Sequence, residues 1–214
     1  MGKFMKIVAI ISQKGGAGKT TLAVHLACAA VAAGYTTAVI DLDPQGTAAS
    51  WADRRQAASP EVISGQAIRL PSLTAAARDN GADLVILDTA PNADQTASLA
   101  ARSADVVLVP CRPSTFDLEA IETTLLLAKT AGKPAHVVLN AVPPRSLIGQ
   151  EAASGLAARG ALVAPHQITQ RAAYTHSVID GRTAMEFEPS GKAAEEIVAL
   201  FGWLCGIVDM PTRG

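Results

Sequence analysis

The chain has 214 residues, of which 49% are hydrophobic and only 4% aromatic, and its formal net charge is -1. This length suits a single doubly wound α/β sheet with a core of small and β-branched side chains. The near-zero charge excludes a general electrostatic attraction to nucleic acid or to membranes, so such a contact would need a local patch. The three cysteines are too far apart to indicate a disulfide framework or a Cys-x-x-Cys metal site.

Apolar runs alternate with helical patterns along the chain, which predicts βαβ units and a mainly parallel sheet with helices on both faces. The predicted strands cover residues 6–11, 36–41, 62–68, 83–88, 105–110, 135–140 and 161–164. The predicted helices cover residues 18–33, 46–57, 72–80, 94–102, 115–131, 147–159, 170–180 and 190–205. Because no linker or repeat interrupts this alternation, we expect a single domain over residues 1–214. The sequence opens on a strand pattern and holds no apolar stretch long enough to cross a bilayer, which predicts a cytoplasmic protein.

A glycine-rich segment, Gln13–Thr20, lies between the first predicted strand and the first predicted helix. A strand, a glycine-rich turn and a helix N-terminus in this order form a cup of backbone N–H groups that binds phosphate. Lys19 would place a positive charge near the outer phosphates, and the Thr20 hydroxyl would bind magnesium. The nucleotide-binding residues that this segment predicts are Lys14, Gly15, Gly16, Ala17, Gly18, Lys19, Thr20 and Thr21.

The segment departs from the usual phosphate loop in two places. Gln13 stands where that pattern has glycine, and Lys14 is an additional lysine. This variant resembles the deviant Walker A loop of the ParA/MinD ATPase superfamily. The resemblance implies a P-loop NTPase fold, ATP and Mg²⁺ as ligands, and a Lys14 side chain that reaches the partner's nucleotide across a dimer interface. A chance glycine-rich turn is the alternative, which eight consecutive residues in register disfavour.

Two carboxylates follow the second predicted strand, in the run Asp41-Leu42-Asp43-Pro44-Gln45. Ligands of parallel sheets bind outside the carboxyl ends of the strands, and side-chain alternation sends Asp41 and Asp43 to the same side. Taken alone, the run fits a helix N-cap with an Asp-Pro turn equally well. Beside the glycine-rich segment it resembles the switch motif of ParA-type ATPases. That resemblance implies that Asp43 orients the catalytic water and that Asp41 lies nearer the magnesium. Together with the two lysines of the loop, the predicted catalytic residues are Lys14, Lys19, Asp41 and Asp43.

A third carboxylate, Asp88, ends the apolar run 84–87. An apolar strand that ends in one aspartate is typical of the Walker B arrangement, whose carboxylate binds magnesium through water. The run from Asp88 to Pro91 resembles the corresponding segment of the ParA/MinD superfamily. Thr20, Asp41 and Asp88 are therefore the predicted metal-binding residues.

The base pocket is predicted from two further positions. Asn140 ends a predicted strand, where its amide could pair with a purine edge. No aspartate follows at the spacing that guanine-specific relatives use, so adenine is expected. The alternative is that Asn140 is a turn residue that satisfies its own backbone. Pro165 lies in a segment that resembles the wall of the base pocket.

The segments 109–114 and 170–174 also resemble the ParA/MinD superfamily, so the resemblance extends from about residue 6 to residue 200. The chain is similar to short ParA-like partition ATPases without an N-terminal helix-turn-helix domain. This similarity implies an ATP-dependent homodimer, non-specific DNA binding, and hydrolysis stimulated by a ParB-like or other cargo adaptor. The output would be segregation or positioning of plasmid, chromosome or protein cargo, with the ATP-bound protein on the nucleoid.

Other functions fit the sequence less well. A MinD-like membrane-cycling ATPase ends in a basic amphipathic helix, whereas residues 201–211 contain no lysine or arginine, so a membrane partner is not expected. An iron–sulfur relative would need a second cysteine near Cys111. A scaffold that binds nucleotide without turnover would not need Asp43 and Asp88. Arg171, Arg182 and Lys192 are candidate DNA contacts, although scattered cations are usually an ordinary solvated surface.

Overall fold

Seven parallel strands form one sheet in the computed structural model, which describes residues 5–92 and 94–211. The strands are β1 (Lys6–Ile10), β2 (Thr37–Asp41), β3 (Glu61–Ser64), β4 (Leu84–Asp88), β5 (Val106–Cys111), β6 (Ala135–Leu139) and β7 (Leu162–Val163). Their order across the sheet is β3-β2-β4-β1-β5-β6-β7, and every pairing of these strands is parallel. The predicted doubly wound α/β fold is confirmed.

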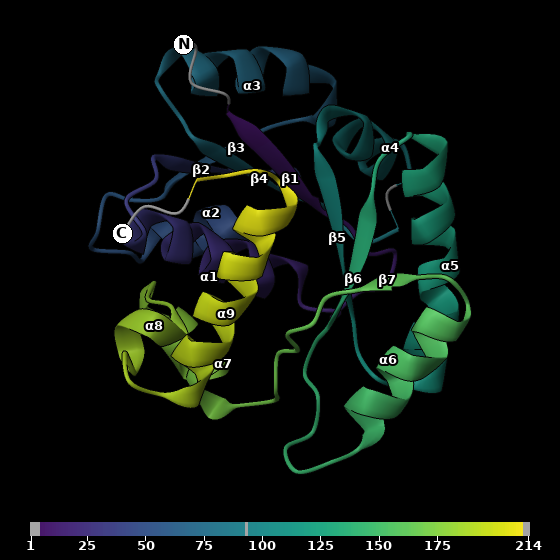
Figure 1. Cartoon of the computed structure of the whole chain (residues 1–214). Helices are drawn as coiled ribbons and strands as arrows, with labels where there is room; N and C mark the ends of the chain where they lie inside the picture. The colour runs from purple at the N-terminus through teal and green to yellow at the C-terminus, as the bar shows by residue number, and fades with distance from the viewer. Residues whose placement is uncertain (1–4, 93, 212–214) are drawn as a thin grey trace.

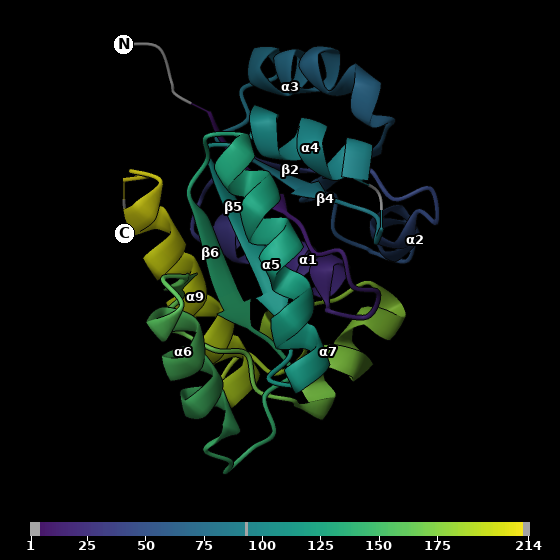
Figure 2. The same cartoon turned by 90° about the vertical axis from the view of Figure 1, so that its right-hand side faces the viewer.

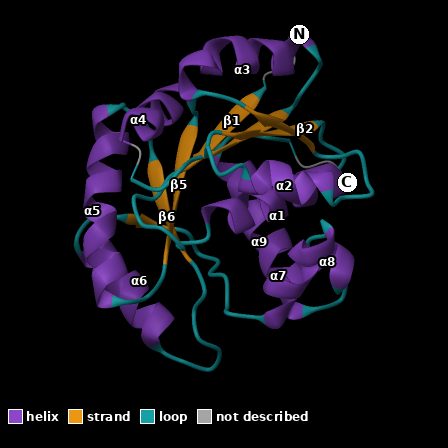
Figure 3. Ribbon diagram, turned by 180° about the vertical axis from the view of Figure 1, so that it is seen from behind, coloured by secondary structure: helices purple, strands orange, loops and turns teal. Residues whose placement is uncertain are grey.

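Helices cover both faces of the sheet and give the molecule three layers (Figure 3). They are α1 (Lys19–Ala32), α2 (Thr47–Asp53), α3 (Leu70–Asp79), α4 (Asp94–Ser103), α5 (Thr115–Thr130), α6 (Ile148–Ala158), α7 (Ala172–Ser177), α8 (Ala184–Phe187) and α9 (Lys192–Ile207). Figures 1 and 2 show α1 and α9 on one side of the sheet and α4 and α5 on the other. No helix among residues 5–92 and 94–211 is long and apolar enough to cross a membrane.

Side-chain alternation along the buried strands produces two separate cores. On β1, Val8 and Ile10 pack with α1, α2 and α9, whereas Ile7 and Ala9 pack with α3 to α6 on the opposite face. Successive residues of a strand point to opposite faces, so a strand buried on both faces must be apolar throughout. This explains the continuous apolar runs that predicted the strands.

Several element limits differ from those that the sequence predicts. The segment predicted as a strand over 62–68 is extended only over β3, and the segment predicted as a helix over 170–180 is α7 followed by a 3-10 turn (Val178–Asp180). Gly181 ends that turn with φ 76°, and a Cβ on it would lie 2.5 Å from the backbone N of Arg55. The helix cannot continue because two backbone segments meet here. The short helix α8 was not predicted; Thr183 and Glu186 begin it with a capping box.

The sheet gathers the predicted site residues at one edge. We call the carboxyl edge the edge at which the strands end; it carries the loops after β1 (11–18), β2 (42–46), β4 (89–92), β5 (112–114) and β6 (140–147). From β1 the chain moves to β2 on one side, and from β4 it crosses to β5 on the other. Such a reversal of strand order opens a ligand crevice at this edge.

Candidate nucleotide site

The loop between β1 and α1 has the curvature that a phosphate cup needs. Gly16 and Gly18 adopt left-handed backbone conformations, with φ 72° and 92°. A Cβ on Gly18 would lie 2.1 Å from Nδ2 of Asn140, so only glycine fits there. Asn140 Nδ2 donates a hydrogen bond of 2.7 Å to the Ala17 carbonyl, which fixes the loop against the end of β6. Helix α1 begins directly after Gly18 with no side-chain cap and no acidic residue in its first turn, which leaves its N-terminus suited to an anion.

Lys19 is buried beneath this loop, with 7% of its surface exposed. Its ammonium donates to the carbonyls of Ser12 (3.1 Å) and Lys14 (3.3 Å). Burial lowers the pKa of Lys19, while the charges of Asp88 and Asp43 act in the opposite direction. The chain therefore holds one cation inside the loop, close to two carboxylates.

Asp88 ends β4 and has no exposed surface. It is paired in register with Ile10 of β1 and with Asp41 of β2. Neither of its carboxylate oxygens has a hydrogen-bond partner among the described residues. Burial raises the pKa of Asp88 to about 7, and the negative charges of Asp41 and Asp43 add to this rise. The Thr20 hydroxyl and the positive charge of Lys19 act in the opposite direction. A buried carboxylate that lies near the Thr20 hydroxyl and Lys19 but forms no hydrogen bond of normal geometry indicates a position at which a cation is bound.

These residues fit a magnesium ion together with a triphosphate. Mg²⁺ takes oxygen ligands and is usually held by one or two carboxylates together with substrate phosphates. Asp88 and the Thr20 hydroxyl provide such oxygens, and the backbone amides of the loop provide donors for phosphate. When bound, the metal would neutralise charge on the phosphates.

Asp41 and Asp43 shape the turn after β2. Asp41 is buried, and its two oxygens accept from the backbone N of Asp43 (3.1 Å) and of Ala49 in α2 (3.0 Å). Asp43 is half-buried, and its Oδ1 accepts from the backbone N of Gln45 (2.9 Å). Both line a cavity of about 580 Å³ at the carboxyl edge. Asp41 thus joins the turn to α2, while Asp43 borders the open cavity.

Lys14 lies on the outer side of the loop and forms an ion pair within its own chain. Its Nζ lies 3.3 Å from Oδ2 of Asp117, and 39% of the Lys14 side chain is exposed. Asp117 also accepts from the Ser114 hydroxyl, and Ser114 caps α5. The sequence does not predict this partner of Lys14, because nothing in a single sequence pairs two residues so far apart.

Three hydrogen bonds join the loop after β4 and the start of α4 to the end of β1 and the phosphate loop. The Thr89 hydroxyl donates to the Ile10 carbonyl (2.9 Å), and the Asn92 backbone N donates to the Gln13 carbonyl (3.2 Å). The Gln13 amide donates to Asp94 at the start of α4 (2.6 Å). A shift of the phosphate loop would therefore be transmitted to α4. The sequence did not predict the Gln13–Asp94 contact.

Residues 8–183 match the CobQ/CobB/MinD/ParA nucleotide binding domain family. The chain belongs to this family. The Maintenance of carboxysome distribution protein A of Gloeobacter kilaueensis is 35% identical over 201 residues, which cover 92% of this chain and 90% of that protein. The protein of the same name from Halothiobacillus neapolitanus is 28% identical, with coverage of 89% and 92%.

The family match and these relatives confirm the resemblance to the ParA/MinD superfamily, and solved structures share the fold. The Pyrococcus furiosus cell division ATPase MinD superposes with a TM-score of 0.76 at 21% identity, covering 97% of this chain and all of that one. Apo McdA of Cyanothece superposes with a TM-score of 0.75 at 18% identity, with coverage of 94% and 100%. At these identities the structures show the fold alone.

The base pocket of this ParA/MinD-family chain stays a prediction. Asn140 uses one amide proton for the Ala17 carbonyl, and its Oδ1 accepts from the backbone N of Ala141 (2.9 Å). One amide proton and one oxygen lone pair remain for a purine. Pro165 is exposed just after β7, and Thr21 is half-buried in the first turn of α1.

The candidate DNA contacts have different surroundings. Arg171 pairs with Glu196 at 2.6 Å, and Arg182 pairs with Asp180 at 2.7 Å. Lys192 is exposed at the start of α9. Only Lys192 of these three has no acidic partner among the described residues.

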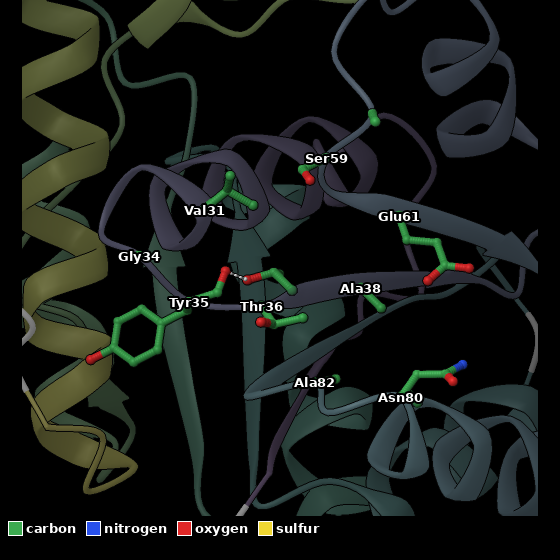
Figure 4. A pocket seen from close by; sticks show the side chains of 12 residues that line it. Val31, Gly34, Tyr35, Thr36, Ala38, Ser59, Glu61, Asn80 and Ala82 are labelled. Atoms are coloured by element: carbon green, nitrogen blue, oxygen red, sulfur yellow. Dashed lines mark hydrogen bonds between the residues drawn. The ribbon is translucent and has the colours of Figure 1, made fainter.

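A second cavity, of about 520 Å³, lies at the opposite edge, where β2, β3 and β4 begin (Figure 4). Tyr35, Glu61 and Asn80 contribute to its walls. The Thr37 hydroxyl donates to the Tyr35 carbonyl there (3.2 Å). None of the predicted site residues lines this cavity.

Proposed function

We propose that this chain is a ParA-type positioning ATPase. It binds Mg²⁺ and ATP at the carboxyl edge, forms an ATP-dependent sandwich dimer, binds DNA without sequence preference and hydrolyses ATP when an adaptor protein stimulates it. The observation that carries this proposal is the convergence of Lys19, Thr20 and the buried carboxylate of Asp88 at one glycine-rich loop. Membership of a nucleotide-binding family supports it.

Each part of the loop has a task in phosphoryl transfer, which depends on positioning and charge neutralisation. The amides of residues 15–20 hold the phosphates, and Lys19 places its charge against them. Thr20 and Asp88 hold the magnesium ion. Asp43, which borders the open cavity, orients the attacking water, and Asp41 keeps the turn that carries Asp43 in place through the backbone of Asp43 and Ala49.

Dimer formation uses Lys14. The Lys14–Asp117 pair is partly exposed, so its net contribution to stability is small and the lysine can exchange one anion for another. In the dimer, Lys14 leaves Asp117 and binds the nucleotide of the second copy. Hydrolysis removes the terminal phosphate that links the two copies, so the dimer then dissociates. The rate of hydrolysis therefore sets the lifetime of the dimer.

The cargo is proposed from the two relatives that match along nearly their whole length. Both carry the name Maintenance of carboxysome distribution protein A. We therefore favour a large protein assembly as cargo over a plasmid or a chromosome, and an adaptor on that assembly as the stimulating partner. A chromosome-partitioning ATPase, Soj of Thermus thermophilus, is 31% identical over a shorter stretch of 144 residues.

This function is tested by measuring the binding of the chain to non-specific duplex DNA in three states: with a non-hydrolysable ATP analogue, with ADP and without nucleotide. Phosphate contacts weaken steeply with salt, so the three states must be compared at one fixed ionic strength. We expect binding only with the triphosphate, and none for Lys19→Ala. Equal binding in all three states, or triphosphate-dependent binding to anionic lipid vesicles in place of DNA, would contradict the proposal.

A further inference from the structure

Arg112 lies at the outer end of the phosphate loop, beside Gly16. It directly follows β5, which is paired with β1 at the centre of the sheet. A Cβ on Gly16 would lie 3.7 Å from Nη2 of Arg112. Gly15 and Gly16 are exposed whereas Ala17 and Lys19 are buried, so the guanidinium lies beside the exposed part of the loop.

The backbone that carries Arg112 is firmly held. The Arg112 carbonyl accepts from the backbone N of Ser114 (2.8 Å), and the Cys111 carbonyl accepts from the backbone N of Asn140 (2.8 Å). Pro113 restricts the turn between them further. The position of the side chain is thus fixed at its base, while the guanidinium itself is exposed.

The guanidinium has no anionic partner in the part of the chain that the structure describes. Four other arginines, Arg55, Arg159, Arg171 and Arg182, each pair with a carboxylate. Lys14, the neighbouring cation on the outer side of the loop, is occupied by Asp117. An arginine presents a planar fork of donors that matches phosphate oxygens. Arg112 is therefore an available phosphate-binding group at the mouth of the loop.

We propose that Arg112 binds the terminal phosphate of a nucleoside triphosphate and so discriminates triphosphate from diphosphate at this site. The inner phosphates lie within the amide cup, and the outermost one extends to its mouth, where Arg112 is placed. The phosphate belongs either to the nucleotide in the same chain or to that of a second copy facing the loop. This inference rests on the proposed function, because it requires a nucleotide in the cup.

The test is a titration of Arg112→Ala with fluorescent non-hydrolysable ATP and ADP analogues, read by fluorescence anisotropy. Loss of a charge-assisted hydrogen bond to phosphate should weaken triphosphate binding about tenfold and leave diphosphate binding within about twofold. Arg112→Lys should retain part of the preference because it keeps the charge. Arg78→Ala is the matched control, since Arg78 is an exposed arginine in the last turn of α3, away from the loop, and should bind both analogues as the unmodified chain does.

Repeating the titration in a Lys14→Ala background distinguishes the two sources of the phosphate. If Arg112→Ala still weakens triphosphate binding in that background, the phosphate belongs to the nucleotide of the same chain. If Arg112→Ala no longer weakens triphosphate binding there, the phosphate belongs to the nucleotide of the second copy. If Arg112→Ala keeps the full triphosphate preference, or weakens both analogues equally, the inference is wrong. If the unmodified chain binds neither analogue, it is the proposed function that fails.

Discussion

The two lysines of the phosphate loop are held in opposite ways. Lys19 is buried and donates to loop carbonyls, whereas Lys14 is partly exposed and pairs with Asp117. A buried cation can bind only an anion held by its own loop, whereas a partly exposed cation can leave one anion for another at little cost in free energy. This difference supports separate tasks for the two residues, Lys19 toward the nucleotide of its own chain and Lys14 toward that of a second copy.

Lys14→Ala should abolish ATP-dependent dimer formation and leave nucleotide binding largely intact. The substitution removes only a partly exposed ion pair, so the free energy of unfolding should change by less than about 1 kcal/mol. Analytical ultracentrifugation with a non-hydrolysable analogue measures the dimer. An unchanged dimer would refute the cross-subunit role of Lys14.

Asp43→Ala should keep the ATP-bound dimer and lose most of its turnover. The Asp43 carboxylate borders the cavity and makes one local hydrogen bond to the backbone of Gln45, so its removal should leave the cup intact. Loss of a water-positioning group typically lowers the rate by a factor of about 10² to 10⁴. Steady-state phosphate release checks this, and a rate equal to that of the unmodified chain would show that another group positions the water.

At the scale of elements, α2, the helix after the turn 42–46, is anchored to a distant part of the chain. Trp51 of α2 donates its Nε1–H to the Arg182 carbonyl (3.1 Å). Arg55, just after α2, donates to the Gly181 carbonyl (2.9 Å) and pairs with Glu186 of α8 (2.5 Å). The other end of α2 is held by Asp41. The turn 42–46 and the region 178–187 are thereby joined through one short helix.

Arg55→Ala should destabilise the fold by about 2–4 kcal/mol, because it removes the ion pair with Glu186 and the hydrogen bond to the Gly181 carbonyl at a partly buried position. The matched control is Arg159→Ala, which removes an exposed ion pair with Glu122 and should cost less than about 1 kcal/mol. Urea unfolding gives both values. Equal losses for the two variants would mean that the Arg55 contacts do not hold α2 in place.

His25 links α1 to α8 and should make stability depend on pH. Its Nδ1–H donates to the Thr21 carbonyl (2.7 Å), so its Nε2 must accept from the backbone N of Ala184 (3.0 Å), which requires a neutral ring. Burial lowers the pKa of His25 to about 4, against the hydrogen bond to Thr21. The unfolded chain, with a pKa of about 6.5, binds this proton more readily, so stability falls as the pH drops from about 6.5 to about 4.

The loss attributable to His25 across that range is roughly 3 kcal/mol. Urea unfolding at several pH values checks it, with His25→Gln as the comparison. We expect the glutamine variant to be less stable at neutral pH and to lose less stability on acidification. Parallel pH profiles for the two proteins would show that His25 does not titrate with unfolding.

The sequence predicted the elements and part of the site for identifiable physical reasons. Continuous apolar runs required strands buried on both faces, and the order of β1, loop and α1 placed Lys19 and Thr20 correctly at the carboxyl edge. The contacts of Lys14 with Asp117, of Gln13 with Asp94 and of Arg112 with the loop were not predictable, because each joins residues brought together only by the sheet. The short helix α8 was missed because its position depends on His25 and Arg55 rather than on its own periodicity.

At the scale of the whole molecule, the parallel sheet brings five loops to one edge, and the proposed nucleotide-binding groups lie in these loops or at the ends of the strands and helix beside them. In the proposed function, the loop after β1 and the first turn of α1 would hold the phosphates, and Thr20 and Asp88 would hold the metal. The ends of β5 and β6 bring Arg112 and Asn140 against the cup. The outer side of this edge presents Lys14 and Arg112. The same edge would therefore bind the nucleotide and face the second copy, which couples ATP binding to dimer formation.

Sedimentation of the unmodified chain, in the presence of magnesium with either a non-hydrolysable ATP analogue or ADP, tests this coupling most directly. We predict a dimer with the triphosphate and a monomer with ADP, at the same protein concentration. A monomer in both conditions, or a dimer that forms equally well with ADP, would contradict the account.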